Sequence, residues 1–315
     1  MARNRGRITV KISVYVPATS ANLGPGFDCM GIALDLWNEL HVEPADQTTI
    51  DIEGFGAEFL PRDESNLVLQ SMRLVYDRYQ LTLPPLHLRM VNRIPIAAGL
   101  GSSAAALVGG LLIANNLLDS PLSRAQILRF AVLEEGHPDN VAPAFLGGAV
   151  LAYLHEDGVT HVNLPLRDNF TFIAVTPDFP LLTEQARNVL SPTVTRQDAI
   201  FNIAHAGFLT AALTTGNTQL LRRALADRLH QEARKHLIPG FDRVTAAAKA
   251  SGAVGTVLSG AGPTLLSIVD DPMRATPVAH AMTTAFAQEG IHATAQILAP
   301  AQIGAYTHMK MNVKK

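Results

Sequence analysis

The residues of this chain that are best suited to chemistry lie in a glycine- and serine-rich segment that runs from Pro95 into a helix. Its sequence is PIAAGLGSSAAA, and it contains no lysine. The backbone N–H groups of such a turn, and of the first turn of the helix, have no partners within the helix, and the helix dipole adds positive charge at the same place. The segment therefore predicts a cradle for an anion such as a phosphate group.

Other interpretations of this segment compete with the phosphate cradle. A P-loop would need a lysine directly after its last glycine, and the segment has none. The stretch from Gly99 to Ala104 fits the dinucleotide fingerprint G-x-G-x-x-A, but Asp119 follows the helix directly, and no second strand presents it to a ribose. The last alternative is a close-packed helix start that binds nothing, and the loops found elsewhere in the chain disfavour it.

Three further loops carry more glycine and polar residues than a connection requires. They are Thr19 to Asp28, Glu135 to Pro143, and Ser259 to Thr264. With the segment at Gly99 they match, in order and type, the motifs of the GHMP kinases, and the chain closely resembles the homoserine kinase family within that superfamily. The resemblance rests on VPATSANLGPGFDCMGIAL, IPIAAGLGSSAAA, EGHPDNVAPAFLGG, TEQAR, RLHQEAR and LSGAGPT, which lie between Val16 and Thr264.

This resemblance implies a fold and an activity. The fold is α+β, with an N-terminal ribosomal-S5-like domain that binds ATP and a C-terminal ferredoxin-like domain. The activity is transfer of the γ-phosphoryl group of ATP to the side-chain hydroxyl of L-homoserine, which gives O-phospho-L-homoserine for threonine biosynthesis. ATP would lie between the domains, with Asn66 facing the adenine and Gly260 and Gly262 closing over the phosphates. The phosphate loop itself would be Pro95, Ile96, Ala97, Ala98, Gly99, Leu100, Gly101, Ser102, Ser103 and Ala104.

The same resemblance implies a magnesium ion held by the Ser103 hydroxyl and the Glu135 carboxylate. Magnesium binds a few protein oxygens together with water and phosphate, and it would supply the positive charge that a lysine supplies elsewhere. The alternatives are a serine that caps the helix and a glutamate at a solvated helix end. Glu134 is a rival ligand, but Glu135 directly precedes the glycine, as in the family pattern.

Asn140 occupies the position at which related mevalonate-type kinases carry an aspartate that is thought to act as the base. An amide orients a hydroxyl but cannot accept its proton at neutral pH. We therefore expect catalysis without a side-chain base, by alignment and electrostatics. His137 lies near the proposed transfer point, but a histidine in a loop is more often structural, and we leave it outside the predicted catalytic set.

A zwitterionic amino acid needs an anionic partner for its ammonium and cationic partners for its carboxylate. Asn22 and Asp28 are assigned to the ammonium, and Arg187 and Arg234 to the carboxylate, since guanidinium groups fit carboxylates. Thr183 is assigned to the catalytic set, because as a helix cap it would share a face with Arg187 four residues later. The alternative for Arg234 is a solvated basic helix that includes Arg222, Arg223, Arg228 and Lys235.

The elements that must position these residues follow from apolar periodicity. Strands are expected at ITVKISVYVPATS, which ends near Pro17, at GIALDLWNELHVEP and at LHLRMVNRIP. Helices are expected at residues 64–79 with Ser65 as cap, over about 17 residues from Ser102, and at 120–135. A new strand and helix series begins at FTFIAVTPDFP and includes one basic helix, QLLRRALADRLHQEARK. We therefore predict two domains, residues 1–164 and 165–315.

Composition narrows the partners. The 315 residues are 48% apolar and 17% charged, as in a well-cored globular protein, and the net charge of −2 favours neither nucleic acid nor a membrane surface. A single cysteine, Cys29, and a start without a signal-peptide pattern predict the cytoplasm. We expect L-homoserine and ATP as partners, together with a second copy, because homodimers are common in the family. Alternatives are another GHMP small-molecule kinase, or a noncatalytic sensor of a nucleotide or an amino acid.

Overall fold

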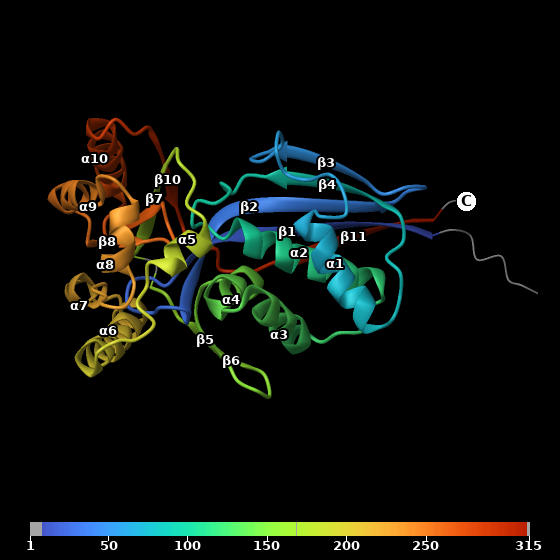
Figure 1. Cartoon of the computed structure of the whole chain (residues 1–315), viewed down its shortest axis with the longest axis horizontal. Helices are drawn as coiled ribbons and strands as arrows, with labels where there is room; N and C mark the ends of the chain where they lie inside the picture. Colours follow the sequence, from blue (N-terminus) through green and yellow to red (C-terminus); the bar gives the residue numbers. More distant parts are fainter. Residues whose placement is uncertain (1–7, 168, 314–315) are drawn as a thin grey trace, which may run out of the picture.

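Two β-sheets organise the chain, and the computed structural model describes residues 8–167 and 169–313 (Figure 1). In the described residues the first sheet has seven strands in the order β11-β1-β2-β4-β3, with β5 on β2 and β6 on β5. Only β3 and β4 run parallel, and the other pairs are antiparallel. These strands are β1 Ile8–Ala21, β2 Met30–Pro44, β3 Thr49–Gly54, β4 Leu86–Asn92, β5 Ala149–Leu154, β6 Val159–Leu164 and β11 Tyr306–Val313.

Strand β1 forms as its alternating pattern predicts, with Ile12, Val14 and Val16 fully buried. It does not end near Pro17, as the sequence analysis expected. A bulge between Pro17 and Ala18 shifts the register, and the strand continues to Ala21. A bulge accommodates a proline within a strand because the ladder is already interrupted there. The polar residues directly before Asn22 are therefore held rigidly by a strand.

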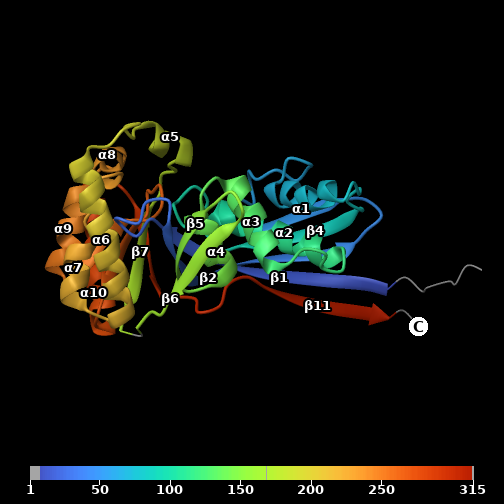
Figure 2. The same cartoon turned by 90° about the horizontal axis from the view of Figure 1, so that it is seen from below.

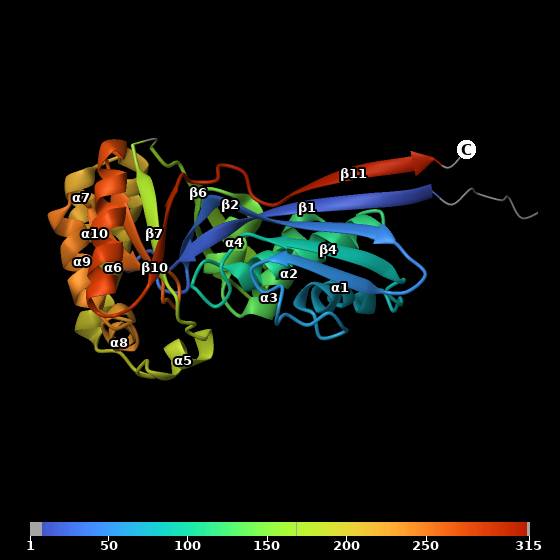
Figure 3. The same cartoon turned by 90° about the horizontal axis from the view of Figure 1, so that it is seen from above.

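Four helices cover one face of the first sheet (Figures 2 and 3). The first of them begins after Asn66, whose side chain accepts a hydrogen bond from the Val68 N–H at 3.0 Å, so Asn66 rather than Ser65 is the cap. The last begins at Pro138, inside the segment predicted as a loop, because proline at the first position and an acidic residue in the first turn favour a helix start. The helices are α1 Leu67–Arg78, α2 Ser102–Leu117, α3 Arg124–Glu135 and α4 Pro138–Leu146.

The second sheet is antiparallel, with the strand order β10-β7-β9-β8. This is the order of the ferredoxin-like βαββαβ motif. Alternate residues of β7 enter two cores: Phe172 joins the large core with α6 and α7, and Ile173 joins a second core with α9 and α10. The elements are β7 Thr171–Pro177, α6 Arg196–Thr215, α7 Thr218–Ala224, α9 Phe241–Ala250, β8 Gly255–Leu258, β9 Leu265–Val269, η2 Pro272–Arg274, α10 Ala275–Gln288 and β10 Ala293–Leu298. The predicted α+β class is confirmed.

One predicted element needs correction, and two strands were not predicted. The expected basic helix is broken: α7 ends at Ala224, residues 225–230 form a turn, and the chain resumes as α8 Gln231–Arg234 and η1 Lys235–Leu237. Strand β3 was not foreseen. Strand β11 was not foreseen either, and it pairs with β1 in the first sheet, although it lies in the predicted C-terminal domain. The boundary between residues 164 and 165 stays a prediction, and residues 1–7, 168 and 314–315 of the two predicted domains lie outside the described residues.

Candidate active site

A cavity of about 470 Å³ opens where the four predicted loops meet. It lies between the helical face of the first sheet and the connections of the second. Most of the predicted site residues line it: Asn22, Asp28, Asn66, Ile96, Ala97, Ala98, Gly99, Gly101, Ser102, Ser103, Glu135, Asn140, Thr183, Arg187, Arg234 and Gly260. Four predicted residues do not line it: Pro95, Leu100, Ala104 and Gly262. Leu100 and Ala104 belong to the apolar core instead.

The carbonyl groups of the loop before α2 are already engaged by other segments of the chain. Four successive carbonyls accept hydrogen bonds from other segments: Ala97 from Leu181 N, Ala98 from Thr264 N, Gly99 from Ser259 Oγ and Leu100 from Thr19 N, at 2.6–3.2 Å. The backbone N–H groups of residues 98–103 donate to no acceptor among the described residues. Gly99 and Gly101 have φ angles of +78° and +72°, which favour glycine. The result is a row of free N–H donors at the N-terminus of a 16-residue helix.

Side chains and loops of other elements fix this geometry. A Cβ atom on Gly101 would lie 2.0 Å from Thr19 Oγ1, and one on Gly99 would lie 2.2 Å from the Ser259 carbonyl oxygen. The Ser259–Thr264 loop connects β8 and β9, and the Gly260 N–H donates to the Ala21 carbonyl. The loop is therefore more than the plain hairpin that the sequence left open, because it braces the back of the Gly99 turn.

Acidic side chains gather beside this cradle at the junction of α3 and α4. The Asp139 carboxylate is buried and accepts a 2.5 Å hydrogen bond from His137 Nδ1. Burial would lower the pKa of His137, but the hydrogen bond to Asp139 and the nearby carboxylates raise it. Burial raises the pKa of Glu135, and the charges of His137 and Arg187 oppose that shift. Glu135 accepts no hydrogen bond from another described residue, so a cation is the partner its ionised form lacks.

A second possible metal group combines Asp28, His137 and Asp139, whose ligand atoms all lie within 4.8 Å of one another. Protein partners already account for these atoms. Asp28 pairs with Arg187, and His137 pairs with Asp139. The predicted magnesium ligands, Ser103 and Glu135, both line the cavity and offer oxygen atoms, which a hard cation prefers.

Asn140 lies in the first turn of α4, and its Oδ1 accepts a hydrogen bond from Thr19 Oγ1 at 2.9 Å. With the oxygen engaged, the amide NH₂ is the polar group left for a ligand, and it can only donate. The structure thus holds the side chain that the sequence singled out, and it identifies Thr19 as the residue that orients it.

Asp28 and Arg187 form a bidentate ion pair, with N···O distances of 2.8 and 3.1 Å. The hydrogen bond to Asp28 raises the pKa of Arg187. The two groups predicted to bind opposite ends of a zwitterion are thus paired with each other. Asn22 stands between them and the Ser259 loop, since its Oδ1 accepts from the Asp28 N–H and its Nδ2 donates to the Gly260 carbonyl.

Arg234 is only 2% exposed, so it is no part of a solvated basic face. Its Nε donates to the Ala186 carbonyl at 3.0 Å, and its Nη1 lies 3.2 Å from the Gly260 carbonyl and 3.3 Å from His230 Nδ1. No described carboxylate lies within 4.0 Å of this guanidinium. Burial and the charge of Arg187 lower its pKa, the more distant charges of Asp28, Asp139 and Asp227 oppose that shift, and an arginine stays protonated. A buried cation without an acidic partner therefore faces the cavity.

Two further predicted residues, Thr183 and Asn66, occupy different surroundings than expected, whereas the surroundings of Cys29 are those of a packed side chain. Thr183 is the first residue of α5 Thr183–Asn188, and Leu182 rather than Thr183 holds the cap position. Asn66 lines the cavity, but its Nδ2 donates to the Pro61 carbonyl and its Oδ1 caps α1, so its polar atoms are already engaged. Cys29 donates to the Phe27 carbonyl, and burial, together with the charges of Asp139 and Asp28, raises its thiol pKa. This supports a packing role for the cysteine.

Sequence reasoning missed several residues of the site. Thr19 and Asp139 contact or flank Asn140, and both stand in the motifs already quoted, whereas His137, which the sequence analysis left outside the catalytic set, pairs with Asp139. Their position within these motifs was the one signal in the sequence that could have identified them as site residues. His230 and Asp227 lie behind Arg234, and only the motif RLHQEAR pointed to that region.

Comparison with known proteins agrees with this geometry. The family described as GHMP kinases N terminal domain matches residues 66–148, and that described as GHMP kinases C terminal matches residues 209–288. The chain belongs to the GHMP kinase family. It is similar to a homoserine kinase of Trichormus variabilis, at 45% identity over 93% of this chain and 97% of the relative. A homoserine kinase of Desulfitobacterium hafniense is 44% identical, over 93% of this chain and 99% of the relative.

Solved structures give the same result. A crystal structure of homoserine kinase from Cytophaga hutchinsonii superimposes with a TM-score of 0.84 and 31% identity, covering 95% of this chain and 97% of the other. Mevalonate kinase of L. major, at 14% identity and a TM-score of 0.72, shares the fold over 92% of this chain and 95% of its own. The predicted two-domain GHMP kinase fold is confirmed. None of the helices in residues 8–167 and 169–313 has the length and apolar character needed to cross a bilayer.

Proposed function

We propose that this chain is an ATP-dependent kinase that phosphorylates the side-chain hydroxyl of L-homoserine, giving O-phospho-L-homoserine in threonine biosynthesis. The observation that carries the proposal is the Arg234 guanidinium, which is buried without an acidic partner among the described residues, in the cavity that the Gly99 cradle also lines. A phosphate cradle alone would suit any GHMP kinase. A buried arginine without an acidic partner among the described residues calls for a substrate with a carboxylate, and the Asp28 carboxylate in the same cavity would select one that also carries an ammonium, which mevalonate lacks.

The chain would bind ATP through the free N–H groups of residues 98–103, most of which belong to residues that line the cavity at the start of α2. Phosphoryl transfer needs little covalent chemistry from a protein, and positioning and charge neutralisation supply most of the catalysis. Gly260 supports the cradle from the opposite loop. Gly262 belongs to the same loop but packs against the side chains of Leu258, Ile238 and Leu181, so it would act through packing rather than by touching the phosphates.

Magnesium would be held by the Ser103 hydroxyl and the Glu135 carboxylate, which both line the cavity. The residues fit such an ion, because the Glu135 carboxyl is half-buried and has no cationic partner within ion-pair distance among the described side chains. When bound, the ion would neutralise charge that develops on the phosphate oxygens.

The transfer itself would depend on alignment. The Asn140 amide, fixed by Thr19, would donate to the acceptor hydroxyl oxygen and aim it at the γ-phosphorus. Thr183 lies at the cavity wall and would contact the same end of the substrate. No side-chain base is required, because the hydroxyl proton passes to the phosphoryl oxygens as the new P–O bond forms and ADP leaves.

The substrate's charged groups would exchange partners with the protein. Its ammonium would bind Asp28 and the Asn22 side chain, and its carboxylate would bind Arg187 and Arg234. Homoserine would therefore insert itself into the existing Asp28–Arg187 pair and satisfy Arg234 at the same time. An acceptor without a carboxylate would leave Arg234 unpaired.

A coupled assay of ADP release with Mg-ATP tests the proposal. We expect turnover with L-homoserine, with a phosphomonoester product, and little turnover with mevalonate or without an acceptor. ADP release that does not depend on homoserine, or equal turnover with mevalonate, would contradict the assignment. Binding of homoserine and ATP without any phosphorylated product would instead favour a noncatalytic sensor.

We also propose a homodimer in the cytoplasm. Support for the dimer comes from α6, where Ile200, Ile203 and Phe208 are 60%, 73% and 46% exposed, which is unusual for large apolar side chains on one helix. Light scattering on the wild type and on Ile203→Glu would test it. We expect a dimer mass for the wild type and a monomer mass for the variant.

A further inference from the structure

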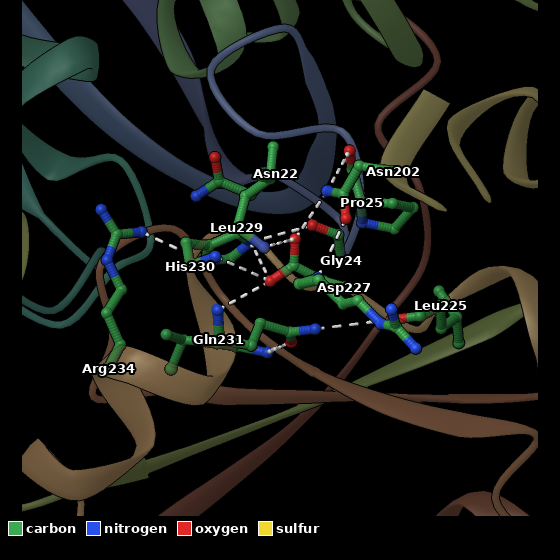
Figure 4. Close-up of polar contacts among 12 residues, drawn as sticks. Asn22, Gly24, Pro25, Asn202, Leu225, Asp227, Leu229, His230, Gln231 and Arg234 are labelled. Carbon is green, nitrogen blue, oxygen red and sulfur yellow. Dashed lines mark hydrogen bonds and ion pairs between the residues drawn. The ribbon is translucent and has the colours of Figure 1, made fainter. Parts of the chain in front are cut away.

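Behind Arg234 lies a buried polar cluster that the proposed chemistry does not use directly (Figure 4). Its members come from α6, from the turn that follows α7, and from α8. The side chains of Asp227 and His230 are both fully buried. Burying such groups is costly unless each is hydrogen-bonded, so the cluster requires an explanation.

The hydrogen bonds of His230 define its protonation. Its Nε2 lies 2.8 Å from the Gly24 carbonyl oxygen, which can only accept, so Nε2 carries a proton. Its Nδ1 lies 3.3 Å from Arg234 Nη1, which can only donate, so Nδ1 presents a lone pair. Burial and the charge of Arg234 lower the pKa of His230, although Asp227 opposes this. The ring is therefore neutral, with one donor and one acceptor in use.

The backbone around His230 is fixed by Asp227. One carboxylate accepts hydrogen bonds from the N–H groups of Leu229, His230 and Gln231, at 3.0, 2.9 and 2.7 Å. The same carboxylate accepts from Asn202 Nδ2 at 2.7 Å, which anchors the turn to α6. This arrangement starts α8 at a defined place, and α8 ends at Arg234.

His230 also contacts the segment that leads to Asp28. Its ring stacks on Phe27, with centroids 5.1 Å apart and an interplanar angle of 23°. The Arg234 guanidinium lies 5.3 Å from the centroid of the same Phe27 ring. His230 thus touches the turn at Gly24, the residue before Asp28, and Arg234. It connects the two parts of the cavity that would receive the ammonium and the carboxylate.

We propose that His230 is a positioning residue for the carboxylate subsite: it holds Arg234 in place as an uncompensated cation and sets its distance from the Asn22–Asp28 segment. This inference rests on the proposed function. A neutral acceptor is suited to the task, because it fixes the guanidinium without neutralising it. A carboxylate at the same place would pair with Arg234 and compete with the substrate.

The test compares two acceptors and three variants in the ADP-release assay. The second acceptor is 3-amino-1-propanol, which keeps the hydroxyl and the ammonium of homoserine but lacks the carboxylate. We expect His230→Leu to raise the homoserine KM by about tenfold or more, as for a lost bond to a charged group, while the ATP KM stays within twofold. The kcat/KM for 3-amino-1-propanol should change little.

Replacement by amides separates the two bonds of the ring. The shorter His230→Asn keeps an acceptor near the position of Nδ1 and should restore most of the homoserine affinity. The longer His230→Gln reaches toward Gly24 instead and should restore less. If His230→Leu does not fold, the order of the homoserine KM values for the asparagine and glutamine variants decides the question.

His205→Leu is a matched control, since His205 also stacks on a phenylalanine and bonds to a carbonyl, but it does not line the cavity. Its kinetics should equal those of the wild type. An equal loss with both acceptors in His230→Leu, or a lower homoserine KM in His230→Gln than in His230→Asn, would overturn the positioning role. If the wild type itself does not phosphorylate homoserine, the proposed function fails, which is a separate result.

Discussion

The substitution Gly99→Ala tests whether the geometry of the phosphate cradle controls activity beyond any effect on the stability of the fold. The new Cβ would lie 2.2 Å from the Ser259 carbonyl oxygen and 2.9 Å from the Gly262 carbonyl oxygen, both in the opposing loop. The optimal separation of non-bonded atoms is about 3.5 Å, so the Gly99 loop and the Ser259–Thr264 loop would have to move apart by roughly 1 Å. A displacement of about 1 Å in a catalytic site can reduce the rate by about 100-fold. We expect that loss in kcat/KM, with the ATP KM raised.

Gly290→Ala is the matched control for this experiment. Gly290 has a φ of +76°, almost the +78° of Gly99, but a Cβ there would meet nothing within 4 Å. Both variants should lose about 1–2 kcal/mol of unfolding free energy from the left-handed backbone, and Gly99→Ala should lose about 1–3 kcal/mol more from its overlap with the opposing loop, measured by denaturant titration. Only Gly99→Ala should lose activity. A Gly99→Ala enzyme that turns over within threefold of the control would refute the conclusion that the two loops fix the cradle.

Four further predictions concern the charged and polar groups of the site. Arg234→Ala should raise the homoserine KM by about 10- to 100-fold, as expected for a lost charge-assisted contact, and Arg187→Ala should raise it less. The ATP KM of both variants should stay unchanged. Equal effects on the KM values of homoserine and ATP would contradict the assignment of these arginines to the substrate carboxylate. Asn140→Ala should lower kcat by at least about tenfold, and unchanged turnover in this variant would remove Asn140 from the mechanism. Asn140→Asp should add a pH dependence to the rate, because a carboxylate can accept a proton and an amide cannot. Glu135→Gln should abolish magnesium-dependent turnover, yet it should raise the unfolding free energy at neutral pH. Burial raises the pKa of Glu135, so its ionised form opposes folding at any pH above the unfolded pKa, and a neutral amide removes that cost. Since the pKa of His137 is raised in the folded state, its contribution to stability is complete below about pH 6.5 and is lost as the pH rises through the folded pKa. The unfolding free energy, measured by denaturation at several pH values, should therefore fall over this range. His137→Gln should remove most of that fall.

The elements that were predicted correctly are those in which one local signal decides the structure. Strand β1 alternates, and α2 follows a glycine turn with a run of small helix-forming residues. Where long-range pairing decides, the prediction failed. Strand β11 reads YTHMKMNV, which is mostly polar, and it forms a strand because β1 offers it an unpaired edge far away in the chain.

The same division applies within the site. Residue types at motif positions predicted which side chains meet, and the cavity brings most of them together. Sequence could not predict the partners of those side chains, because partners depend on tertiary distance. The basic residues around Arg234 in the sequence suggested a solvated helix face. The break between α7 and α8 instead turns Arg234 inward, where the carbonyl groups of Ala186 and Gly260 accept its hydrogen bonds.

The Asp28–Arg187 pair explains why the two arginines should differ. Both of its side chains are about one-third exposed, at 35% and 36%, and a pair of that kind contributes only about 0–1 kcal/mol. A substrate that brings one ammonium and one carboxylate can therefore open the pair at little cost and replace each half of it. Removal of Arg187 takes away one contact to the carboxylate but also releases Asp28 for the ammonium, so the two effects partly cancel. Arg234 has no acidic partner to release, and its removal leaves only a loss.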